Sequence, residues 1–513
     1  MVSFVVCLYV YMIKKKYKKR SKMNLVKNNT NSTPILMRQK FIKLILLFFI
    51  FHCIQINCIG QNPNPSSSLD ATIQNEMSIR HFPGVSTIIV KNNEIVWVES
   101  YGYADIANSI QVEDTTAFLL ASVSKLFTGT AAMQLHEAGT VDLDTDINSY
   151  LPWTVEIPNF NNDAITIRQL MTHTSSIKDN WGVMSSFYGY PDPTITLANC
   201  MESYFPTSGS NYNATGNFIN SAPGSSYQYS NMASALNGYV VEVSAGVPFD
   251  DYCDNNLFNE LCMENTAWHF SDFNPSQVAI PYSYQNSNYT PHSHYGFADY
   301  PNGQLRSTVL DIGNFMIAFL NGGTLGSNSI LSPTTVNDML SFQIPMLDTT
   351  QGLNWYRTKL YYSGGEAMLW GHSGGESGVN THLLIDPFNE VGVCVLTNGE
   401  GDGLYICDAL YDHALSMNVN NSIIPNCSNT VEISELEDQK EILIYPNPAK
   451  DFINVEIDIN EDTQYNIYSI SGKLVLSGFV NSQNRNIKLP NLSAGLYIFK
   501  LQNKSAQLLE INN

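Results

Sequence analysis

The chain has little charge, and positive charge in particular is scarce. Only 14% of its 513 residues are charged, and 26 basic residues stand against 46 acidic ones, for a formal net charge of −20. The first 60 positions hold many of the basic residues and no acid, so the remainder carries about −31. Such a surface repels phosphate groups and anionic lipids. We therefore expect no nucleic-acid partner, and membrane contact only through the N-terminal segment.

The sequence also lacks a recognisable metal site. The acidic run Asp142-Leu-Asp-Thr-Asp146 has the spacing of a calcium loop but lacks its glycine and distal glutamate, which favours a surface turn. The cysteines after residue 60 do not follow the spacing of a zinc site, although an oxidising compartment would permit disulfides of open connectivity. These are Cys200, Cys253, Cys262, Cys394, Cys407 and Cys427. We expect no metal and no cofactor.

Residues 1–60 have the pattern of an upstream segment followed by a signal peptide. Met37 to Lys43 is basic, Leu44 to Ile54 is apolar, and Asn57-Cys-Ile-Gly60 offers small residues before a cleavage site. The apolar run is too short to span a bilayer comfortably. An uncleaved anchor and lipidation at Cys58 remain alternatives. The segment predicts export.

Apolar alternation and turn residues predict a mixed α/β domain over residues 69–417. Val85–Val90 and Ile95–Glu99 form a predicted hairpin, and a second pair of strands, Thr381–Ile385 and Val391–Leu396, follows much later. Helical patterns lie between them, one of them at Val309–Leu320. Another, Leu404–Leu415, closes the domain, which favours one sheet built from both ends with a helical insertion. Residues 180–222 are predicted to form a lid or loop.

A polar, acidic linker at residues 418–440 separates this domain from the tail. Residues 441–513 contain short alternating strands with Gly and Asn turns. This pattern predicts a small β-sandwich.

The motif Ser122-Val-Ser-Lys125 is the first candidate for chemistry. It opens an apolar helix predicted to begin near Ser122, so the two side chains share one helical face. The positive field of a helix N-terminus favours an alkoxide on Ser122 and disfavours an extra proton on the amine. A serine with its own lysine base can act as a nucleophile. A second match, Ser175-Ser-Ile-Lys178, leads into a turn-like stretch and is the weaker candidate.

Two further motifs follow in order. Tyr229-Ser-Asn231 places a phenol and an amide before an apolar helix, and His372-Ser-Gly-Gly375 places an imidazole beside glycines where a ligand can approach the backbone. Each motif alone is weak, because Tyr-x-Asn recurs elsewhere and a single His is more often structural. The motifs become specific only as a set that occurs in this order along the chain.

The ordered set resembles the serine β-lactamase and D-Ala-D-Ala peptidase superfamily, in its class C-like, esterase and D-aminopeptidase branch. The similarity spans about residues 79–417, and implies an antiparallel sheet flanked by helices with a helical subdomain. The motifs that carry it are Pro83-Gly84, Tyr101 to Asp105, Ser122 to Lys125, Leu170 to Ser175, Pro223-Gly224, Tyr229 to Asn231, Gly303 to Thr308, Gly371 to Gly375, Asp386-Pro387 and Leu396 to Asn398.

The resemblance also implies roles for single residues. Ser122 would attack an acyl carbonyl, Lys125 would accept or relay its proton, and Tyr229 would shuttle a proton to the leaving group. Asn231 would orient the substrate or Lys125. Backbone N–H groups of Ser122 and Gly375 would form the oxyanion hole.

Two positions depart from the family pattern. His372 stands where many relatives have Lys, so it would hold a substrate carboxylate with only a partial charge near its usual pKa of about 6.5. Ser176 replaces a usual Gly. The first departure favours an esterase or D-peptide hydrolase over an efficient β-lactamase.

The tail resembles the type A sorting domain of type IX secretion. The motifs are Tyr445 to Asp451, Tyr468 to Lys473 and Leu492 to Tyr497. The resemblance implies a secreted or cell-surface protein that passes the periplasm, meets the type IX machinery and loses its tail. A generic adhesion module is the alternative.

Together these features predict an exported serine hydrolase. It would form an acyl-enzyme on Ser122 with small-molecule or peptide acyl substrates, namely esters, D-amino-acid peptides or amides, or β-lactams. The lid at 180–222 and residues 270–300 would build the pocket. A different class remains open, a non-catalytic, penicillin-binding-like acyl sensor or binding protein.

Overall fold

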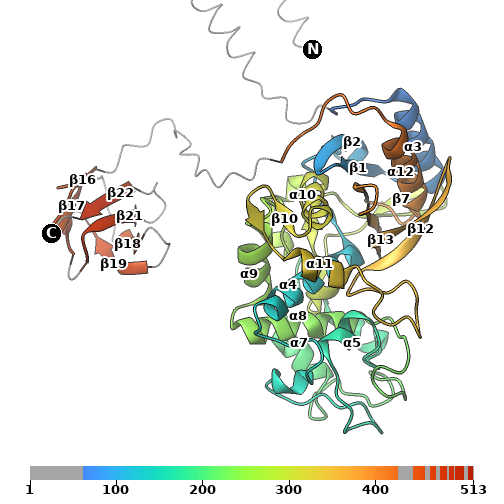
Figure 1. Ribbon diagram of the computed structural model, residues 1–513, viewed down its shortest axis with the longest axis horizontal. Helices are drawn as coiled ribbons and strands as arrows, with labels where there is room; N and C mark the ends of the chain where they lie inside the picture. The colour runs from blue at the N-terminus through green and yellow to red at the C-terminus, as the bar shows by residue number, and fades with distance from the viewer. Residues whose placement is uncertain are drawn as a thin grey trace, which may run out of the picture. The chain divides into compact units, whose positions relative to one another are not determined.

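The computed structural model describes residues 62–425 and, in the tail, residues 443–456, 463–469, 474–481, 484–489, 492–501 and 507–511. The chain divides into two compact units, the second beginning after residue 428 (Figure 1). The predicted signal peptide and most of the predicted linker lie outside the described residues, as do Cys58 and Cys427. Within the described ranges, no helix is both long and apolar enough to cross a bilayer.

A seven-stranded antiparallel sheet joins the two ends of the first unit. Its order is β12-β13-β14-β15-β1-β2-β3, so the N-terminal hairpin pairs with the C-terminal strands inside the sheet, with Ile88 opposite Cys394. This confirms the predicted sheet built from both ends. The strands are β1 (Gly84–Lys91), β2 (Glu94–Asp105), β3 (Ile110–Gln111), β12 (Tyr356–Tyr362), β13 (Gly365–Glu376), β14 (Val379–Asp386) and β15 (Val391–Thr397).

Alternate side chains of the central strands enter two separate cores. Val85 and Ile89 of β1 pack on the side of α3 (Ser67–Arg80) and α12 (Leu404–Ser416), which lie together in Figure 1. Ile88 and Val90 pack on the side of α10 (Val309–Leu320). Because successive side chains point to opposite faces and both faces are covered, these strands have apolar residues at successive positions, as in Ile88–Val90 and Val393–Leu396. That continuity made them predictable.

The helical region is centred on two helices that pack against each other, α4 (Ser124–Glu137) and α8 (Asn231–Ala245). Most of α4 is buried, including Lys125. Ser230 caps α8 by accepting a hydrogen bond from the Ala233 N–H, and Gly246 ends it in the left-handed region at φ +74°. Smaller helices complete the region: α5 (Ile167–Met171), α6 (Trp181–Met184), α7 (Leu197–Tyr204), α9 (Phe249–Cys253) and α11 (Pro333–Met339).

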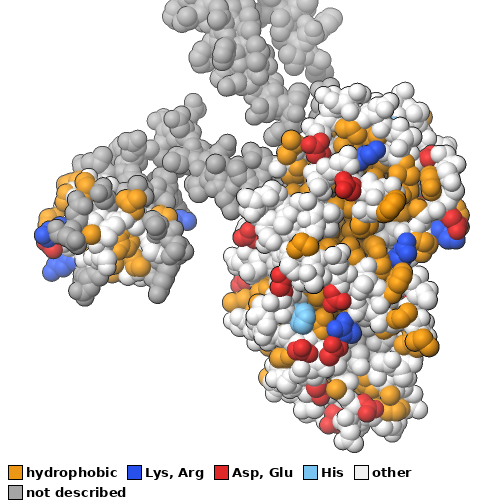
Figure 2. Space-filling model, in the orientation of Figure 1, with side chains coloured by type: hydrophobic (Ala, Val, Ile, Leu, Met, Phe, Trp, Pro, Cys, Tyr) orange, Lys and Arg blue, Asp and Glu red, His pale blue; other side chains and the backbone are white. Residues whose placement is uncertain are grey.

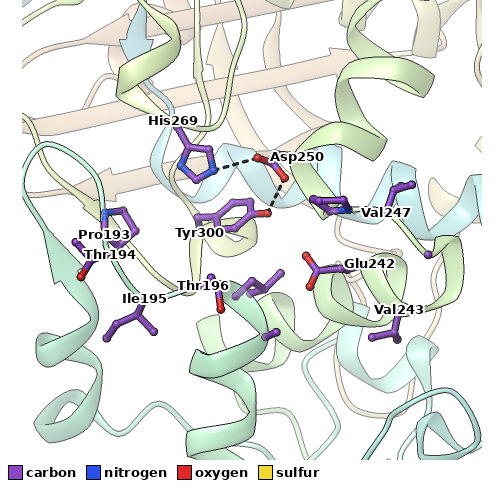
Figure 3. A pocket seen from close by; sticks show the side chains of 14 residues that line it. Pro193, Thr194, Ile195, Thr196, Glu242, Val243, Val247, Asp250, His269 and Tyr300 are labelled. Atoms are coloured by element: carbon purple, nitrogen blue, oxygen red, sulfur yellow. Dashed lines mark hydrogen bonds and ion pairs between the residues drawn. The ribbon is translucent and has the colours of Figure 1, made fainter. Parts of the chain in front are cut away.

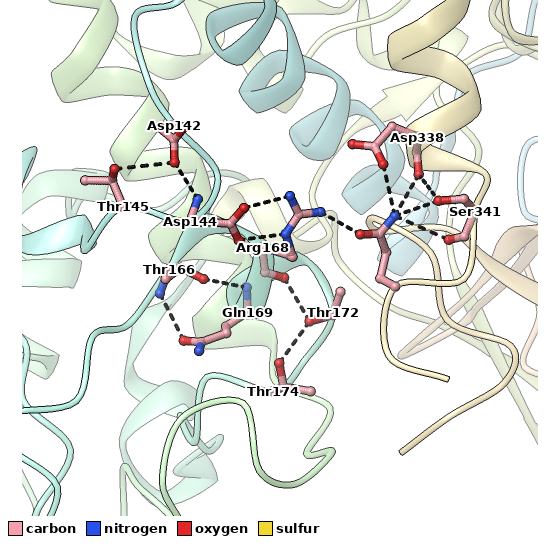
Figure 4. Close-up of polar contacts among 11 residues, drawn as sticks. Asp142, Asp144, Thr145, Thr166, Arg168, Gln169, Thr172, Thr174, Asp338 and Ser341 are labelled. Atoms are coloured by element: carbon pink, nitrogen blue, oxygen red, sulfur yellow. Dashed lines mark hydrogen bonds and ion pairs between the residues drawn. The ribbon is translucent and has the colours of Figure 1, made fainter. Parts of the chain in front are cut away.

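A polar network ties α5 to two loops (Figure 4). Arg168 donates to both carboxylate oxygens of Asp144 at 2.7 and 2.9 Å, and to Gln343 at 2.6 Å. Thr166 and Gln169 form a capping box at the start of the helix. The acidic run therefore forms the predicted turn, with one carboxylate paired to arginine. Among the described residues, no group of three or more His, Cys, Asp or Glu side chains is placed to hold a metal.

Three local predictions were wrong or incomplete. The His372 motif, for which no strand was predicted, lies inside β13, and the edge strand β12 was missed as well. Residues 180–222 are not loop throughout, because they include α6 and α7. Gly residues at 371, 374 and 375 interrupt the apolar pattern of β13, which hides the strand from sequence analysis.

The second unit contains short strands in two sheets, as expected for a small β domain. One sheet has the order β16-β17-β20, with β16 (Leu443–Tyr445), β17 (Phe452–Glu456) and β20 (Asn486–Lys488). The other has the order β19-β18-β21-β22, with β18 (Thr463–Ser469), β19 (Leu474–Val480), β21 (Gly495–Leu501) and β22 (Gln507–Ile511). Ile453, Ile467 and Phe499 are among the side chains of its separate core.

Candidate active site

Ser122 lies in a tight turn between β4 (Phe118–Leu119) and helix α4. The turn is the 3₁₀ helix η1 (Ala121–Val123), so the α-helix begins at Ser124, two residues later than predicted. Ala121, just before the serine, has φ +47°, a conformation that costs a non-glycine residue energy. Leu120 holds the turn from both sides, donating to Leu305 O at 2.8 Å and accepting from the Thr381 hydroxyl at 2.6 Å. The strained backbone is therefore fixed by the sheet.

Lys125 is fully buried and has three polar neighbours. Its Nζ lies 3.1 Å from Ser122 Oγ, 2.8 Å from Asn231 Oδ1 and 2.6 Å from the carbonyl oxygen of Asn302. Burial lowers its pKa to about 7, although nearby carboxylates raise it. The amide and carbonyl oxygens can only accept, so a neutral amine satisfies them with its two N–H groups. Its lone pair is then available to the Ser122 hydroxyl.

Asp179 fixes the orientation of Asn231. One Asp179 oxygen accepts from the side-chain amide of Asn231 at 2.9 Å and from its backbone N–H at 3.1 Å. The other accepts from the Ser230 hydroxyl and the Met232 N–H, both at 3.0 Å. Because the amide nitrogen faces Asp179, the amide oxygen must face Lys125. No motif marks Asp179 in the sequence, where it lies in the turn after the weaker Ser-x-x-Lys match.

Tyr229 approaches Ser122 from the other side. Its hydroxyl donates to Ser122 Oγ at 3.0 Å, and burial raises its pKa, so the phenol stays protonated at neutral pH. The ring of His173 packs against the Tyr229 ring with centroids 4.3 Å apart. Burial also lowers the pKa of His173 well below its usual value, so this neighbour is neutral. The structure therefore brings Ser122, Lys125, Tyr229 and Asn231 together.

His372 is close to this group but is not charged. Burial, followed by the charge of Lys125, lowers its pKa to about 3. Its Nδ1 lies 2.6 Å from the Ser373 carbonyl, which can only accept, so Nδ1 carries the proton. The ring packs against Tyr356 and does not line the pocket at Ser122. The expectation of a partly charged His372 near neutral pH is wrong, because that expectation assumed exposure to solvent.

A cavity of about 170 Å³, here called the Ser122 pocket, opens at the serine. Tyr229, Asn231 and Gly375 line it together with Ser122. A side chain at Gly374 would come within 2.3 Å of the Leu120 carbonyl, whereas one at Gly375 would meet nothing within 4 Å. The first glycine lets β13 approach the turn, and the second leaves space for substrate. Trp181, Met184 and Phe297 also line the pocket, which confirms that the predicted lid and residues 270–300 build it.

The second Ser-x-x-Lys match has no comparable geometry. Ser175 is buried in the loop after α5, and the amine of Lys178 donates to the Thr215 carbonyl at 3.1 Å. Neither residue lines the Ser122 pocket.

A larger cavity of about 630 Å³ lies elsewhere in the same unit (Figure 3). Three of its polar side chains contact one another: His269 Nε2 lies 3.2 Å from Asp250, and the Tyr300 hydroxyl donates to Asp250 at 3.4 Å. The candidate nucleophile and base do not line it. The turn η7 (Tyr300–Asn302) separates the two cavities, with Tyr300 lining the larger and Asn302 the smaller. The serine chemistry belongs to the smaller one.

Residues 69–415 match the beta-lactamase family, described as "Beta-lactamase". The chain belongs to this family. Its fold is that of the family's serine hydrolases, an antiparallel sheet flanked by helices. Residues 443–510 match the secretion system C-terminal sorting domain, so the beta-lactamase domain is followed by a type IX sorting tail.

Three similar proteins share 17–24% sequence identity with the chain. Protein flp of Staphylococcus aureus (strain MRSA252) is 24% identical over 336 residues, which cover 64% of this chain and 62% of flp. FmtA from Staphylococcus aureus has a TM-score of 0.55 at 17% identity, over 74% of this chain and 97% of FmtA. EstCE1, a hydrolase with promiscuous acyltransferase activity, has a TM-score of 0.51 at 21% identity, over 67% of this chain and 97% of EstCE1. At these identities the structural likeness establishes the fold alone.

Proposed function

We propose that this protein is an exported serine hydrolase that works through an acyl-enzyme on Ser122. The observation that carries the proposal is the buried Lys125 amine, which lies 3.1 Å from Ser122 Oγ and has a pKa of about 7. An amine that is neutral near physiological pH can take the serine proton, which an ordinary lysine cannot.

The proposed reaction begins when Ser122 Oγ attacks the acyl carbonyl and its proton passes to Lys125. Backbone N–H groups of Ser122 and Gly375 stabilise the oxyanion. Tyr229 gives a proton to the departing alcohol or amine and recovers one from Lys125. The ester C–O or amide C–N bond breaks and the acyl group stays on Ser122. Water then releases it by the same proton route in reverse.

The charge of the pocket favours some substrates over others. No Lys or Arg is among the described residues that line it, and His372 is neutral. A substrate carboxylate, as in β-lactams, would find no cation beside Ser122 except the buried Lys125. Esters and D-amino-acid amides or peptides are therefore the preferred candidates, ahead of β-lactams.

Burst kinetics test this proposal against the acyl sensor. We expect the full chain, mixed with excess p-nitrophenyl acetate, to release about one equivalent of p-nitrophenolate quickly and then to continue at a steady rate. A burst without steady release would identify a sensor, because acylation would occur without deacylation. Failure to turn over this ester, D-alanyl amides and nitrocefin alike would contradict the hydrolase proposal.

The tail supports export to the cell surface or beyond. Its sorting domain is a signal for type IX secretion, and we propose that it contributes nothing to the chemistry. Deletion of residues 441–513 is expected to retain the protein in the periplasm of a type IX-competent host with its hydrolase activity intact. Cell fractionation followed by an esterase assay measures both. Release of the truncated protein to the medium would contradict the assignment.

A further inference from the structure

The Ser122 pocket contains two carboxyl groups whose presence the hydrolase chemistry does not explain. Asp299 and Glu376 both line it, whereas no basic residue among those described does. Acidic side chains also outnumber basic ones on the face shown in Figure 2. An enzyme acting on neutral or anionic acyl groups gains nothing from acids at this position, because they repel a developing oxyanion.

Asp299 is buried, and only one of its two carboxyl oxygens is hydrogen-bonded to another residue. The residue is 2% exposed, and its Oδ2 accepts from the Asn302 side chain at 2.7 Å. Its Oδ1 is buried and accepts no hydrogen bond from any other described residue. Buried polar atoms are nearly always paired, since an unpaired one costs free energy. Burial raises the pKa of this carboxyl group to about 7. An unpaired carboxyl oxygen in a substrate pocket points to a donor supplied by the substrate, and a cationic donor would favour the ionised form.

Lys125 is not that donor. Its three hydrogen-bond partners are Ser122, Asn231 and the Asn302 carbonyl, and it affects Asp299 only through its charge. Asn302 lies between the two residues, donating to Asp299 and accepting from Lys125. The carboxyl group is therefore held close to the catalytic amine, while its buried Oδ1 has no donor among the other described residues.

Glu376 and the aromatic walls fit the same ligand. The Tyr188 hydroxyl and the Ser377 N–H hold the Glu376 carboxylate, both at 3.0 Å. Trp181 and Phe297 present aromatic side chains to the same pocket, and an aromatic face attracts a cation. At about 170 Å³ the cavity is smaller than the roughly 300–1,000 Å³ of sites for drug-sized ligands. The pocket therefore suits a small group with a positive charge.

We propose that Asp299, assisted by Glu376, binds the ammonium group of a small substrate whose acyl part carries a free amine. The substrate class is aminoacyl esters and amides with an unmodified amino terminus. This inference rests on the proposed function, because it places the aminoacyl carbonyl at Ser122. The two carboxyl groups are specificity-determining, and they leave the acylation chemistry to Lys125 and Tyr229.

A pair of isosteric esters tests the charge recognition in the full chain. Alanine methyl ester, as both enantiomers, and methyl isobutyrate differ by an ammonium group in place of a methyl group. We expect the wild type to prefer one alanine ester by about 10–100-fold in kcat/KM, as for a hydrogen bond to a charged group. Asp299→Asn should lower this preference at least about tenfold. The readout is the ratio of kcat/KM for the two esters, because loss of a carboxylate that raises the pKa of Lys125 acts on both esters alike. Glu376→Gln should lower it less.

The matched control is Glu242→Gln, which neutralises a carboxylate that lines the larger cavity. It should leave the preference unchanged. Equal losses for both esters in Asp299→Asn would mean that Asp299 acts on the chemistry, and an unchanged preference would mean that it does not bind the amine. Either result overturns the inference, and Glu376→Gln provides the test if Asp299→Asn does not fold.

Calorimetry separates this inference from the proposed hydrolase function. Binding of alaninamide, compared with isobutyramide, requires no turnover. Tighter binding of alaninamide that is lost in Asp299→Asn would support ammonium recognition even if neither ester were hydrolysed. Equal binding of the two amides in the wild type would overturn it even if Ser122-dependent hydrolysis of methyl isobutyrate were measured.

Discussion

Replacing Ser122 with alanine is expected to abolish hydrolysis and covalent labelling by a fluorophosphonate probe. The substitution removes the oxygen that lies 3.1 Å from Lys125 Nζ and accepts a hydrogen bond from the Tyr229 hydroxyl at 3.0 Å. No other hydroxyl in the described residues lies between this amine and this phenol. We expect turnover to fall by roughly 10⁴-fold or more, as when the nucleophile of a serine hydrolase is lost. Steady-state assays and gel fluorescence measure the two effects.

Ser175→Ala is the matched control, because Ser175 belongs to the other Ser-x-x-Lys motif and is buried in a packed loop away from the Ser122 pocket. It should retain labelling and turnover. Mass spectrometry of the labelled wild type should place the adduct on the peptide that contains Ser122. An adduct that persists in Ser122→Ala and is lost in Ser175→Ala would disprove the assignment.

The parts of the fold that sequence predicted are those in which local pattern and tertiary burial agree. The apolar runs of β1 and β15 mark strands covered on both faces, and Thr308, which caps α10, marks the helix start. Strand β13 was missed because glycine has a low strand propensity. Its glycines instead allow the backbone of β13 to approach other segments closely. At Gly374 a side chain would collide with the Leu120 carbonyl, a contact between segments more than 250 residues apart. No local pattern encodes such a contact.

In the candidate site, too, residues that belong to local motifs were predicted and residues placed by tertiary contacts were not. Ser122, Lys125, Tyr229 and Asn231 carry motifs with fixed spacing, and the structure groups them. Asp179 has no such motif, since its role depends on meeting the start of α8 some fifty residues later. The charge of His372 could not be judged either, because burial and the nearby Lys125 decide its pKa. Spacing predicts which groups meet, but protonation follows from the environment that they share.

The pH dependence of acylation should follow Lys125. For a neutral ester, kcat/KM is expected to rise with pH through about 7 and then level off, because only the neutral amine can accept the Ser122 proton. The other groups around the amine are the carboxyl groups of Asp179, Asp299 and Glu376, which raise its pKa. Burial raises the pKa of Asp299 itself to about 7, so this group changes charge in the same pH range. The buried His372 and His173 stay neutral at this pH. Stopped-flow acylation between about pH 5.5 and 9 gives the profile.

Variants separate the charge of Lys125 from its position. Lys125→Arg keeps a permanent cation and should lower acylation by about 10²–10⁴-fold without the rise near pH 7. Glu376→Gln removes a carboxylate that favours the ammonium form, so the rising limb should move to lower pH. A wild-type profile that is flat from pH 6 to 8, or a rise retained by Lys125→Arg, would exclude Lys125 as the base.

The lowered pKa of Lys125 also makes the free energy of unfolding depend on pH. The pKa of Lys125 lies at about 7 in the folded protein against 10.5 for an ordinary lysine, so between these values the unfolded chain binds more protons. Stability therefore rises with pH across this window, and the contribution is lost as pH falls through about 7. In Lys125→Met that contribution is absent. Melting temperatures measured from pH 9 to 6 should accordingly fall further for the wild type than for Lys125→Met, and parallel curves would show that the buried amine keeps an ordinary pKa.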